Sequence, residues 1–201
     1  MLEFLYSLDK TIFDFCNQTL SNPIFDLIMP TLTNWNQSWI GLGLAGGFLL
    51  LLIWRGGKKG RIAAVLLIPI IIASDQISSS IIKTLVARPR PCHLINGLPV
   101  LENIHLLVPC GGGYSFPSSH AANNFAFATL ISFFYRRWSW IAFIYAGLMA
   151  FSRVSVGVHY PSDIIGGALV GMLCAAMVII LWEMLSKIYP TLSVNNETAN
   201  I

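Results

Sequence analysis

Five long apolar stretches constrain this chain more than any other feature of its sequence. They cover residues 39–54, 62–82, 121–135, 138–152 and 164–182, and Asp75 is the one charged residue within them. Only 10% of the 201 residues are charged, against roughly 25% in a soluble domain, and the mean hydropathy is +0.68. The 55% of apolar residues exceed what a 22.2 kDa globule can bury. We therefore expect an all-α integral membrane protein, a bundle of five to six transmembrane helices.

Several of these stretches are shorter than the roughly 20 residues that cross a bilayer. Aromatic residues at their ends are typical of membrane interfaces and extend the spans: Trp39, Trp54, Tyr135, Trp138 and Trp182. Glycines within the spans are most simply positions where helices pack closely: Gly41, Gly43, Gly46, Gly47, Gly166, Gly167 and Gly171.

Residues 1–37 have the pattern of an amphipathic helix. Apolar residues recur at helical spacing (Leu2, Leu5, Leu8, Ile12, Phe15) and charged residues take other positions (Glu3, Asp9, Lys10, Asp14). We expect one or two helices lying in the membrane interface up to about Thr31, with Pro23 and Pro30 as breaks. An acid at Glu3 argues against a signal peptide. The predicted organisation is an interfacial segment (1–37), a transmembrane domain (38–185) and a cytoplasmic tail (186–201).

Basic residues predict the orientation, because cytoplasmic loops carry an excess of Lys and Arg. The loop after the first stretch, the loop between the third and fourth, and the C-terminal tail hold seven of the twelve: Arg55, Lys58, Lys59, Arg61, Arg136, Arg137 and Lys187. The C-terminus is then cytoplasmic, and the N-terminal segment, the long loop 83–119 and the short loop 153–163 lie outside. A net charge of +3 without a basic run excludes a nucleic-acid binder.

Three motifs fall on that outer face. Lys83 is followed after six residues by Arg90-Pro91, then come Pro117-Ser118-Ser119-His120, and then Ser152-Arg153, five residues, His159, three residues and Asp163. In these residues the sequence resembles the type-2 phosphatidic acid phosphatase superfamily, which includes vanadium-dependent haloperoxidases and glucose-6-phosphatase. The motifs of that superfamily read Lys-x6-Arg-Pro, Pro-Ser-Gly-His and Ser-Arg-x5-His-x3-Asp. The resemblance runs from about residue 60 to 182, and Ser119 stands where the family usually has Gly.

Physical chemistry supports this resemblance, because a phosphoryl group needs dispersed positive charge on its oxygens. We expect Lys83, Arg90 and Arg153 to hold the phosphate, the arginines through planar bidentate contacts. Ser118 and the backbone N–H groups of Ser119 and His120 would lie at a helix N-terminus, which favours an anion. Gly at position 119 would approach phosphate more easily than Ser, but a small residue fits.

The resemblance also assigns the chemistry. His159 is implied to be the nucleophile that forms a phosphohistidine, and Asp163, four residues later, to orient it. His120 is implied to protonate the leaving group and then to activate water, so we expect a bell-shaped dependence of rate on pH. The cations should lower the pKa of His159 and Asp163 should raise it, and the sequence leaves the balance open. Neither a metal nor a cofactor is required, because the cations supply the positive charge.

Other polar residues carry weaker interpretations. Arg88 is expected to be a rim charge, and His93 and His105 to be loop residues. Asp75 begins a polar stripe with Ser79 and Lys83 and either supports the site or satisfies a polar partner in the bundle. Two cysteines enclose seventeen residues of the outer loop and would pair in an oxidising compartment, and two others are apolar fillers (Cys92 and Cys110; Cys16 and Cys174).

The predicted function is hydrolysis of a lipid phosphomonoester or pyrophosphate at the outer face of a bacterial inner membrane. Undecaprenyl pyrophosphate, phosphatidylglycerophosphate, phosphatidic acid and the 1-phosphate of lipid A are the candidate substrates, and the oligomeric state is left open. Two alternatives remain. One is a lipid phosphotransferase that uses the same intermediate, and the other is a catalytically silent protein that binds or translocates lipid phosphates. A vanadium haloperoxidase is disfavoured because those relatives are soluble and much larger.

Overall fold

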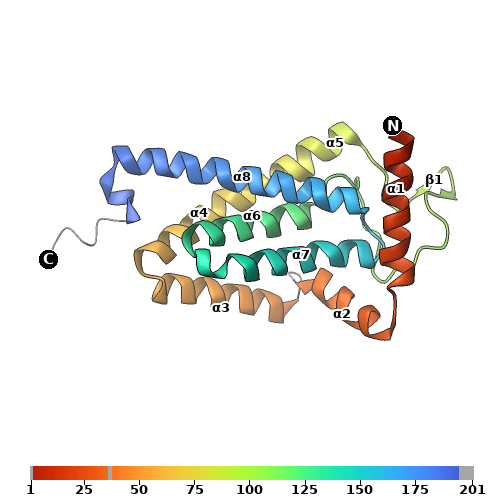
Figure 1. The fold of residues 1–201 in the computed structure, drawn as a ribbon, viewed down its shortest axis with the longest axis horizontal. Helices are drawn as coiled ribbons and strands as arrows, with labels where there is room; N and C mark the ends of the chain where they lie inside the picture. Colours follow the sequence, from red (N-terminus) through yellow and green to blue (C-terminus); the bar gives the residue numbers. More distant parts are fainter. Residues whose placement is uncertain (1, 36–37, 195–201) are drawn as a thin grey trace.

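The computed structural model describes residues 2–35 and 38–194, and it is predominantly helical (Figure 1). The α-helices are α1 (Leu2–Asp14), α2 (Pro23–Thr33), α3 (Trp39–Arg55), α4 (Gly57–Asp75), α5 (Lys83–Val86), α6 (Ser119–Phe134), α7 (Ser139–Ser155) and α8 (Pro161–Ile188). Short π- or 3-10-helical segments cover Phe15–Thr19, Gln76–Ile82, Arg136–Trp138 and Pro190–Leu192. Strands β1 (Leu94–Ile95) and β2 (Leu98–Pro99) form a small antiparallel hairpin.

All five apolar stretches predicted to be helical are helical. Within residues 2–35 and 38–194, two continuous helices have the length and composition to cross a membrane, Gly57–Val86 and Pro161–Ile188. The first of them joins α4, the π-helical segment and α5 without a break. Helices α3, α6 and α7 are shorter, with 17, 16 and 17 residues.

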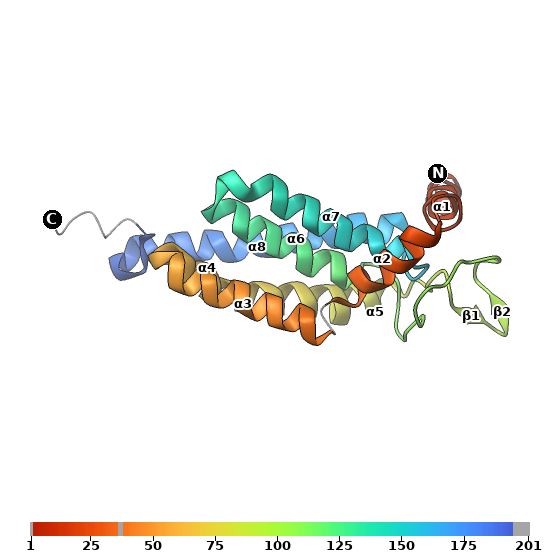
Figure 2. The same cartoon turned by 90° about the horizontal axis from the view of Figure 1, so that it is seen from below.

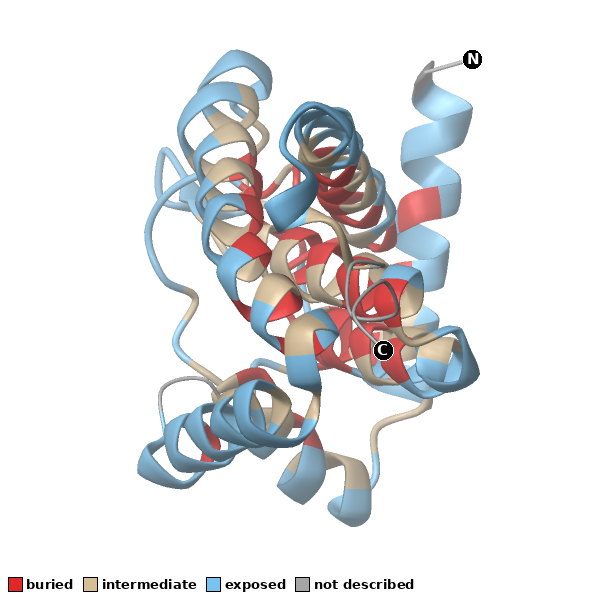
Figure 3. Cartoon of the chain, turned by 90° about the vertical axis from the view of Figure 1, so that its left-hand side faces the viewer, coloured by how far each residue is buried: buried red, intermediate tan, exposed pale blue. Residues whose placement is uncertain are grey.

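Helix α6 lies at the centre of the bundle and packs against α4, α7 and α8. Buried residues from α4, α6 and α8 form the largest apolar core: Ala63, Leu66, Ile70, Ala126, Leu130, Phe134, Ala175 and Ile179. The prediction that glycines mark close helix packing holds for Gly171 of α8, where an added Cβ would lie 1.9 Å from the carbonyl oxygen of Ala122 in α6. It is wrong for Gly43, Gly46 and Gly47 of α3, where an added Cβ would meet nothing within 4 Å. In Figure 3 the buried positions face the centre of the bundle and the exposed ones face outward.

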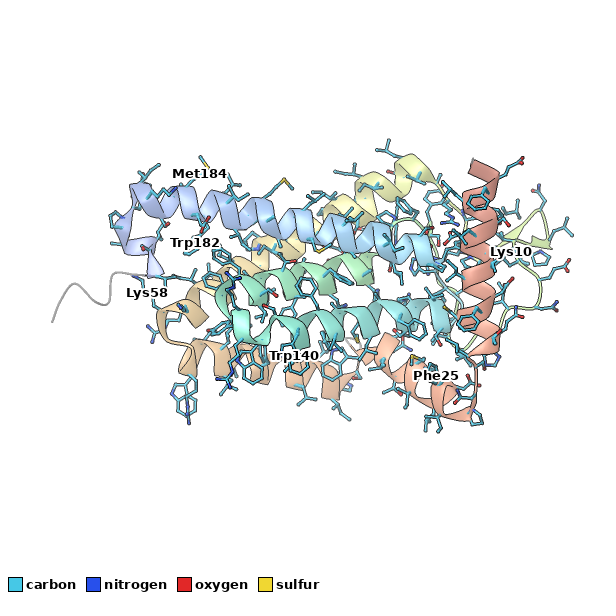
Figure 4. All side chains as sticks on the ribbon, viewed as in Figure 1. Lys10, Phe25, Lys58, Trp140, Trp182 and Met184 are labelled. Atoms are coloured by element: carbon cyan, nitrogen blue, oxygen red, sulfur yellow. A yellow bond between two sulfur atoms is a disulfide. The ribbon has the colours of Figure 1, made fainter. Side chains whose placement is uncertain are left out.

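The outward faces of the bundle are apolar along its length. Trp39 is 90% exposed, Ile40 77% and Leu173 62%, as an environment of lipid rather than water would allow. Figure 4 places Lys58 and Trp182 near one end of the bundle and Lys10 at the opposite end, on α1. The bundle therefore has an apolar outer surface along its length and polar groups at its ends.

Helix α1 crosses one end of the bundle instead of running along it, and Figure 2 shows it end-on. The predicted apolar stripe of α1 faces away from the protein, with Leu5 and Leu8 about half exposed, at 53% and 45%. A different face packs inward through Phe13 and Asp9, which are 0% and 7% exposed. This arrangement leaves the stripe available to lipid.

Some predicted boundaries are wrong. Pro30 does not break a helix but lies inside α2, which continues to Thr33, whereas Pro23 begins α2 after the N-cap Asn22. Arg153 belongs to the last turn of α7 rather than to a loop. Helix α8 ends at Ile188, so residues 186–188 of the predicted tail are helical. Residues 195–201 of that tail, and 36–37 at the first predicted boundary, lie outside the described residues.

Candidate active site

The three motifs come from separate segments of the chain and meet at the end of the bundle that α1 crosses. Lys83 lies in α5, His120 in the first turn of α6 and Arg153 in the last turn of α7, while Arg90 and His159 lie in loops. Lys83 is within electrostatic range of both Arg90 and Arg153, and His120 is within range of His159 and of all three cations. The predicted phosphate-binding and catalytic residues therefore share one site.

His159 is buried, with 2% of its surface exposed, in the turn between α7 and α8. Tyr160 is the N-cap of α8 and Pro161 its first residue, so that Asp163 falls in the first turn. The Oδ2 atom of Asp163 lies 3.3 Å from Nδ1 of His159, as the four-residue spacing predicts. This contact places the proton on Nδ1 and leaves Nε2 of His159 with its lone pair.

Asp163 has three further donors that fix its carboxylate. The backbone N–H of Tyr160 donates to Oδ2 at 2.8 Å, Arg88 Nη1 donates to Oδ1 at 3.0 Å, and the hydroxyl of Ser115 donates to Oδ2. Ser115 is fully buried and its oxygen also lies 3.4 Å from Nδ1 of His159. Ser115 could not be predicted from the sequence, because nothing in the spacing links a loop serine to an aspartate 48 residues later.

Arg88 corrects another prediction, because it is not a rim charge. Its guanidinium bridges Asp163 and Asp9 of α1, with Nη2 2.6 Å from Oδ2 of Asp9, and it lies 3.8 Å above the ring of Tyr160. Asp9 also accepts a hydrogen bond from the backbone N–H of Ser162 at 2.8 Å. The sequence placed Asp9 on the polar face of an amphipathic helix and gave no signal that this face packs against the site.

Burial dominates the acid–base balance of His159. Removal from water lowers the pKa of His159 to about 4, and the charges of Arg153 and Arg90 act in the same direction. Asp163 raises this pKa through its hydrogen bond and its charge, but by less than burial lowers it. The imidazole is therefore neutral near pH 7, the state in which Nε2 is nucleophilic.

The predicted phosphate-binding cations lie within electrostatic range of carboxylates but form no close ion pair with them in the described part of the chain. Lys83, Arg90 and Arg153 form no ion pair within residues 2–35 and 38–194. Arg90 Nη1 donates to the carbonyl of Cys110 at 2.8 Å and Arg153 Nη1 to the hydroxyl of Thr33 at 3.0 Å, which orient the two side chains. Burial lowers the pKa of Arg90, although Asp163 opposes it.

Four buried polar atoms of the site have no hydrogen-bond partner among the described residues: Nε of Arg90, Nε of Arg153, Oγ of Ser119 and Nε2 of His120. Buried polar groups are normally paired, so unpaired groups need an explanation. Three of these atoms are donors or hydroxyls and the fourth is a titratable ring nitrogen, a set that matches the oxygens of a phosphate group.

Residues 118–120 lie at the N-terminus of helix α6, as the sequence predicts. Ser118 is the N-cap, and its hydroxyl accepts from the backbone N–H of Ala121, so part of its hydrogen-bonding capacity serves the helix. The N–H of Ser118 itself donates to the carbonyl of Asp163 at 2.9 Å, which ties the start of α6 to the His159–Asp163 pair. Ser119 lies in the helix and is not among the non-glycine residues with positive φ, so Ser replaces Gly there without backbone strain.

The remaining predictions have separate outcomes. Cys92 and Cys110 form a disulfide in the loop that carries Arg90. His93 and His105 lie in loops, where His105 Nε2 is 3.0 Å from Oδ2 of Asp26 in α2. Asp75 accepts a hydrogen bond from Asn123 of α6 at 3.4 Å, the polar partner in the bundle that one interpretation expected. It also acts electrostatically on Lys83, as the other interpretation, support of the site, expected.

No group of three His, Cys, Asp or Glu side chains comes together as a metal site in the described part of the chain. An apolar helical bundle that brings cations, a helix N-terminus and a His–Asp pair to one end has the parts of a phosphoryl-transfer enzyme.

Residues 64–187 match the PAP2 superfamily. The chain is 32% identical over 175 residues to the lipid A 4'-phosphatase of Bacteroides thetaiotaomicron, which covers 85% of this chain and 75% of that protein. It is 29% identical over 152 residues to undecaprenyl-diphosphatase BcrC of Bacillus subtilis, covering 76% of this chain and 72% of that protein. The chain belongs to the PAP2 superfamily, as its motifs indicated.

Solved structures agree with this assignment. The crystal structure of Aquifex aeolicus LpxE is similar to this chain with a TM-score of 0.69 and 28% sequence identity, over 86% of this chain and 95% of that one. A transmembrane PAP2-type phosphatidylglycerolphosphate phosphatase from Bacillus subtilis has the same fold, with a TM-score of 0.62 and 21% identity over 90% and 87% of the two chains.

Proposed function

We propose that this protein is a membrane phosphatase that hydrolyses a lipid phosphomonoester or pyrophosphate through a phosphohistidine. The observation that carries the proposal is a buried, neutral His159, fixed by Asp163 and facing Arg153 and Arg90, two cations that form no ion pair among the described residues. A neutral imidazole supplies the nucleophile, and unpaired cations supply the charge that a phosphate requires.

In the first step Nε2 of His159 attacks phosphorus while Lys83, Arg90, Arg153 and the N-terminus of α6 hold the phosphate oxygens. A P–N bond forms, the P–O bond to the lipid breaks, and protonated His120 gives its proton to the departing oxygen. Asp163 accepts the Nδ1–H of His159 and stabilises the positive charge that develops on the imidazole.

In the second step water attacks the phosphohistidine. His120, now neutral, takes a proton from that water as its oxygen bonds to phosphorus. The P–N bond breaks, inorganic phosphate leaves, and both histidines return to their starting protonation states. Ser118 and Ser119 contribute to the phosphate site as helix cap and hydroxyl donor.

The substrate class follows from the relatives and from the position of the site. One relative is named a lipid A 4'-phosphatase and another an undecaprenyl-diphosphatase, so phosphates on both glycolipid and polyprenyl carriers are candidates. The site lies at the end of an apolar bundle, which a lipid headgroup reaches by lateral diffusion. Phosphatidylglycerophosphate and phosphatidic acid complete the candidate set.

The proposed arrangement in the membrane has five helices spanning the bilayer, α3, α4 with its continuation, α6, α7 and α8. Helix α1 and the rest of 1–37 lie in the outer interface, 38–185 forms the transmembrane domain, and the C-terminal tail is cytoplasmic. The site then faces the outside of a bacterial inner membrane. The distribution of basic residues and the exposed apolar stripe of α1 support this arrangement.

Phosphate release by the detergent-purified protein tests the proposal. The substrates are lipid A, undecaprenyl pyrophosphate, phosphatidylglycerophosphate and phosphatidic acid, with EDTA present and His159→Ala in parallel. We expect release that resists EDTA and is lost in the variant by at least about a thousandfold. The preferred lipid identifies the substrate class.

Two other outcomes would contradict hydrolysis. Transfer of phosphate to an added alcohol or lipid without release of inorganic phosphate would make the protein a phosphotransferase. Lipid-phosphate binding that His159→Ala leaves intact, without turnover of any substrate, would make it a binding or translocating protein.

A further inference from the structure

Helix α1 places a carboxylate directly behind the candidate active site. Asp9 is 7% exposed although it comes from a helix that crosses the end of the bundle. Its Oδ1 accepts the backbone N–H of Ser162 at 2.8 Å, and its Oδ2 lies 2.5 Å from the hydroxyl of Ser162 and 2.6 Å from Nη2 of Arg88. Both oxygens of Asp9 are therefore committed to groups that flank Asp163.

Arg88 connects Asp9 to Asp163. Its Nη1 donates to Oδ1 of Asp163 at 3.0 Å and to the hydroxyl of Ser162 at 2.6 Å, while Nη2 bonds Asp9. The guanidinium stacks 3.8 Å above the ring of Tyr160, whose backbone N–H also bonds Asp163. A planar guanidinium whose two terminal nitrogens are hydrogen-bonded and whose face lies on a ring has little freedom to turn.

Aromatic contacts hold α1 on the same turn. The rings of Tyr6 and Phe13 lie 6.3 and 5.7 Å from that of Tyr160, and Phe13 belongs to a buried cluster with Val154 and Leu101. The segment that follows α1 is held as well, because Asn17 bonds the carbonyls of Ser155 and His105. The helix is thus attached to the residues on either side of His159.

A continuous series of alternating charges results. Asp9 bonds Arg88, Arg88 bonds one oxygen of Asp163, and the other oxygen of Asp163 faces Nδ1 of His159. Because Ser115 and Tyr160 occupy that second oxygen as well, Arg88 is the group that fixes Oδ1 and hence the plane of the carboxylate. A rotated carboxylate would no longer accept from His159 in line with the ring.

We propose that Asp9 and Arg88 are positioning residues, through which helix α1 holds Asp163 in the orientation that the nucleophile His159 needs. The proposal rests on the proposed function, since positioning has a catalytic meaning only if His159 attacks phosphate. It makes α1 part of the catalytic domain rather than a separate anchor.

Kinetics give the first test. Asp9→Asn and Arg88→Gln should each lower kcat by roughly tenfold or more and change KM less than about threefold, because neither residue touches substrate. Glu3→Gln is the matched control, since Glu3 is an exposed carboxylate on the same helix. Asp9→Glu should recover part of the lost kcat, as its charge is kept.

The titration of His159 gives a second test that needs no substrate. The groups that face His159 are Asp163 of α8, Arg153 of α7, Arg90 and Ser115 of the loop and His120 of α6. Arg88→Gln removes a positive charge behind Asp163 and should raise the titration midpoint of His159 by about half a pH unit. Asp9→Asn removes a negative charge and should lower it.

Histidine-labelled protein in detergent allows this measurement by NMR, with four histidines in the chain and His159→Asn to assign the resonance. Midpoint shifts of opposite sign support the proposal even if no tested lipid is hydrolysed, a result that would contradict the proposed function alone. An unchanged midpoint in both variants, with a lower melting temperature, would overturn the proposal and leave these contacts as attachment of α1. Active wild-type protein with unaltered kcat in both variants would overturn it as well.

Discussion

Burial sets the acid–base behaviour of His159 more strongly than its charged neighbours do. Its pKa is lowered to about 4 from the ordinary value of 6.5, although Asp163 lies 3.3 Å away. The proposed nucleophile is therefore neutral above about pH 4 and becomes protonated as pH falls through that value. We expect kcat/KM to fall on the acid side near pH 4 rather than near 6.5, measured with a substrate whose own ionisation is determined separately.

The same shift predicts how stability depends on pH. The unfolded chain, with a pKa of 6.5 for this histidine, binds a proton that the folded chain does not bind between pH 6.5 and about 4. The contribution of His159 to the free energy of unfolding is therefore present above pH 6.5 and lost as pH falls through that window.

An acid limb of kcat/KM at 6.5 would show instead that His159 is solvated or is not the nucleophile.

Single residues differ in how far the sequence reveals them. His159 and Asp163 were predictable because four residues across a helix start bring two side chains together. Ser115, Arg88 and Asp9 were not, because their contacts join the long loop between α5 and α6 and the N-terminal helix to α8. Local spacing carries no signal for such contacts, and Arg88 was misinterpreted for that reason.

The loop that carries Arg90 is closed by the Cys92–Cys110 disulfide, and Arg90 donates to the carbonyl of Cys110. Removing the crosslink with Cys92→Ala and Cys110→Ala should free this side chain and raise KM by roughly three- to tenfold, with a smaller effect on kcat. Cys16→Ala is the control, as that thiol is unpaired. Initial rates over a range of substrate concentrations separate the two constants, and an unaltered KM would show that the crosslink does not orient Arg90.

Close packing of α6 and α8 requires glycine at position 171. A Cβ there would lie 1.9 Å from the carbonyl oxygen of Ala122, whereas a Cβ at Gly43 of α3 would meet nothing within 4 Å. We expect Gly171→Ala to destabilise the protein by about 1–3 kcal/mol, because the helices must separate. Gly43→Ala should be neutral or slightly stabilising, since Ala favours helix.

Thermal unfolding in detergent compares these two glycine variants directly. Equal melting temperatures would mean that the bundle accommodates the methyl group by a helix shift. Loss of activity in Gly171→Ala is expected in addition, because Ala122 belongs to the first turn of α6 beside His120.

Helices were predictable as elements, but their ends were not. The apolar stretches identified the five bundle helices because lipid-exposed helices carry apolar residues on every face. Helix α7 includes Arg153 in its last turn, and α8 extends past Trp182 to include Lys187. A long charged side chain at a helix end can reach polar surroundings, so its charge does not end the helix. Pro30 lies inside α2, which continues to Thr33 although proline cannot donate a backbone hydrogen bond there.

At the scale of the whole molecule, the fold places its candidate active-site residues at one end and most of the Lys and Arg residues outside that site at the other. Lys10 on α1 lies at the site end, and Lys58 lies at the opposite end beside Lys59 and Arg61 (Figure 4). Cytoplasmic loops carry an excess of basic residues, so this asymmetry predicts that the site faces outward. A lipid phosphate in the outer leaflet would then reach His159 without crossing the bilayer.

Single cysteines at the two ends test this orientation. Lys10→Cys and Lys59→Cys, both at exposed positions, are introduced into a chain carrying Cys16→Ala and Cys174→Ala, with the Cys92–Cys110 disulfide retained. A membrane-impermeant maleimide applied to intact spheroplasts should label Lys10→Cys at once and Lys59→Cys only after permeabilisation. Labelling in the reverse order would place the site in the cytoplasm, and the substrate would have to be a lipid of the inner leaflet.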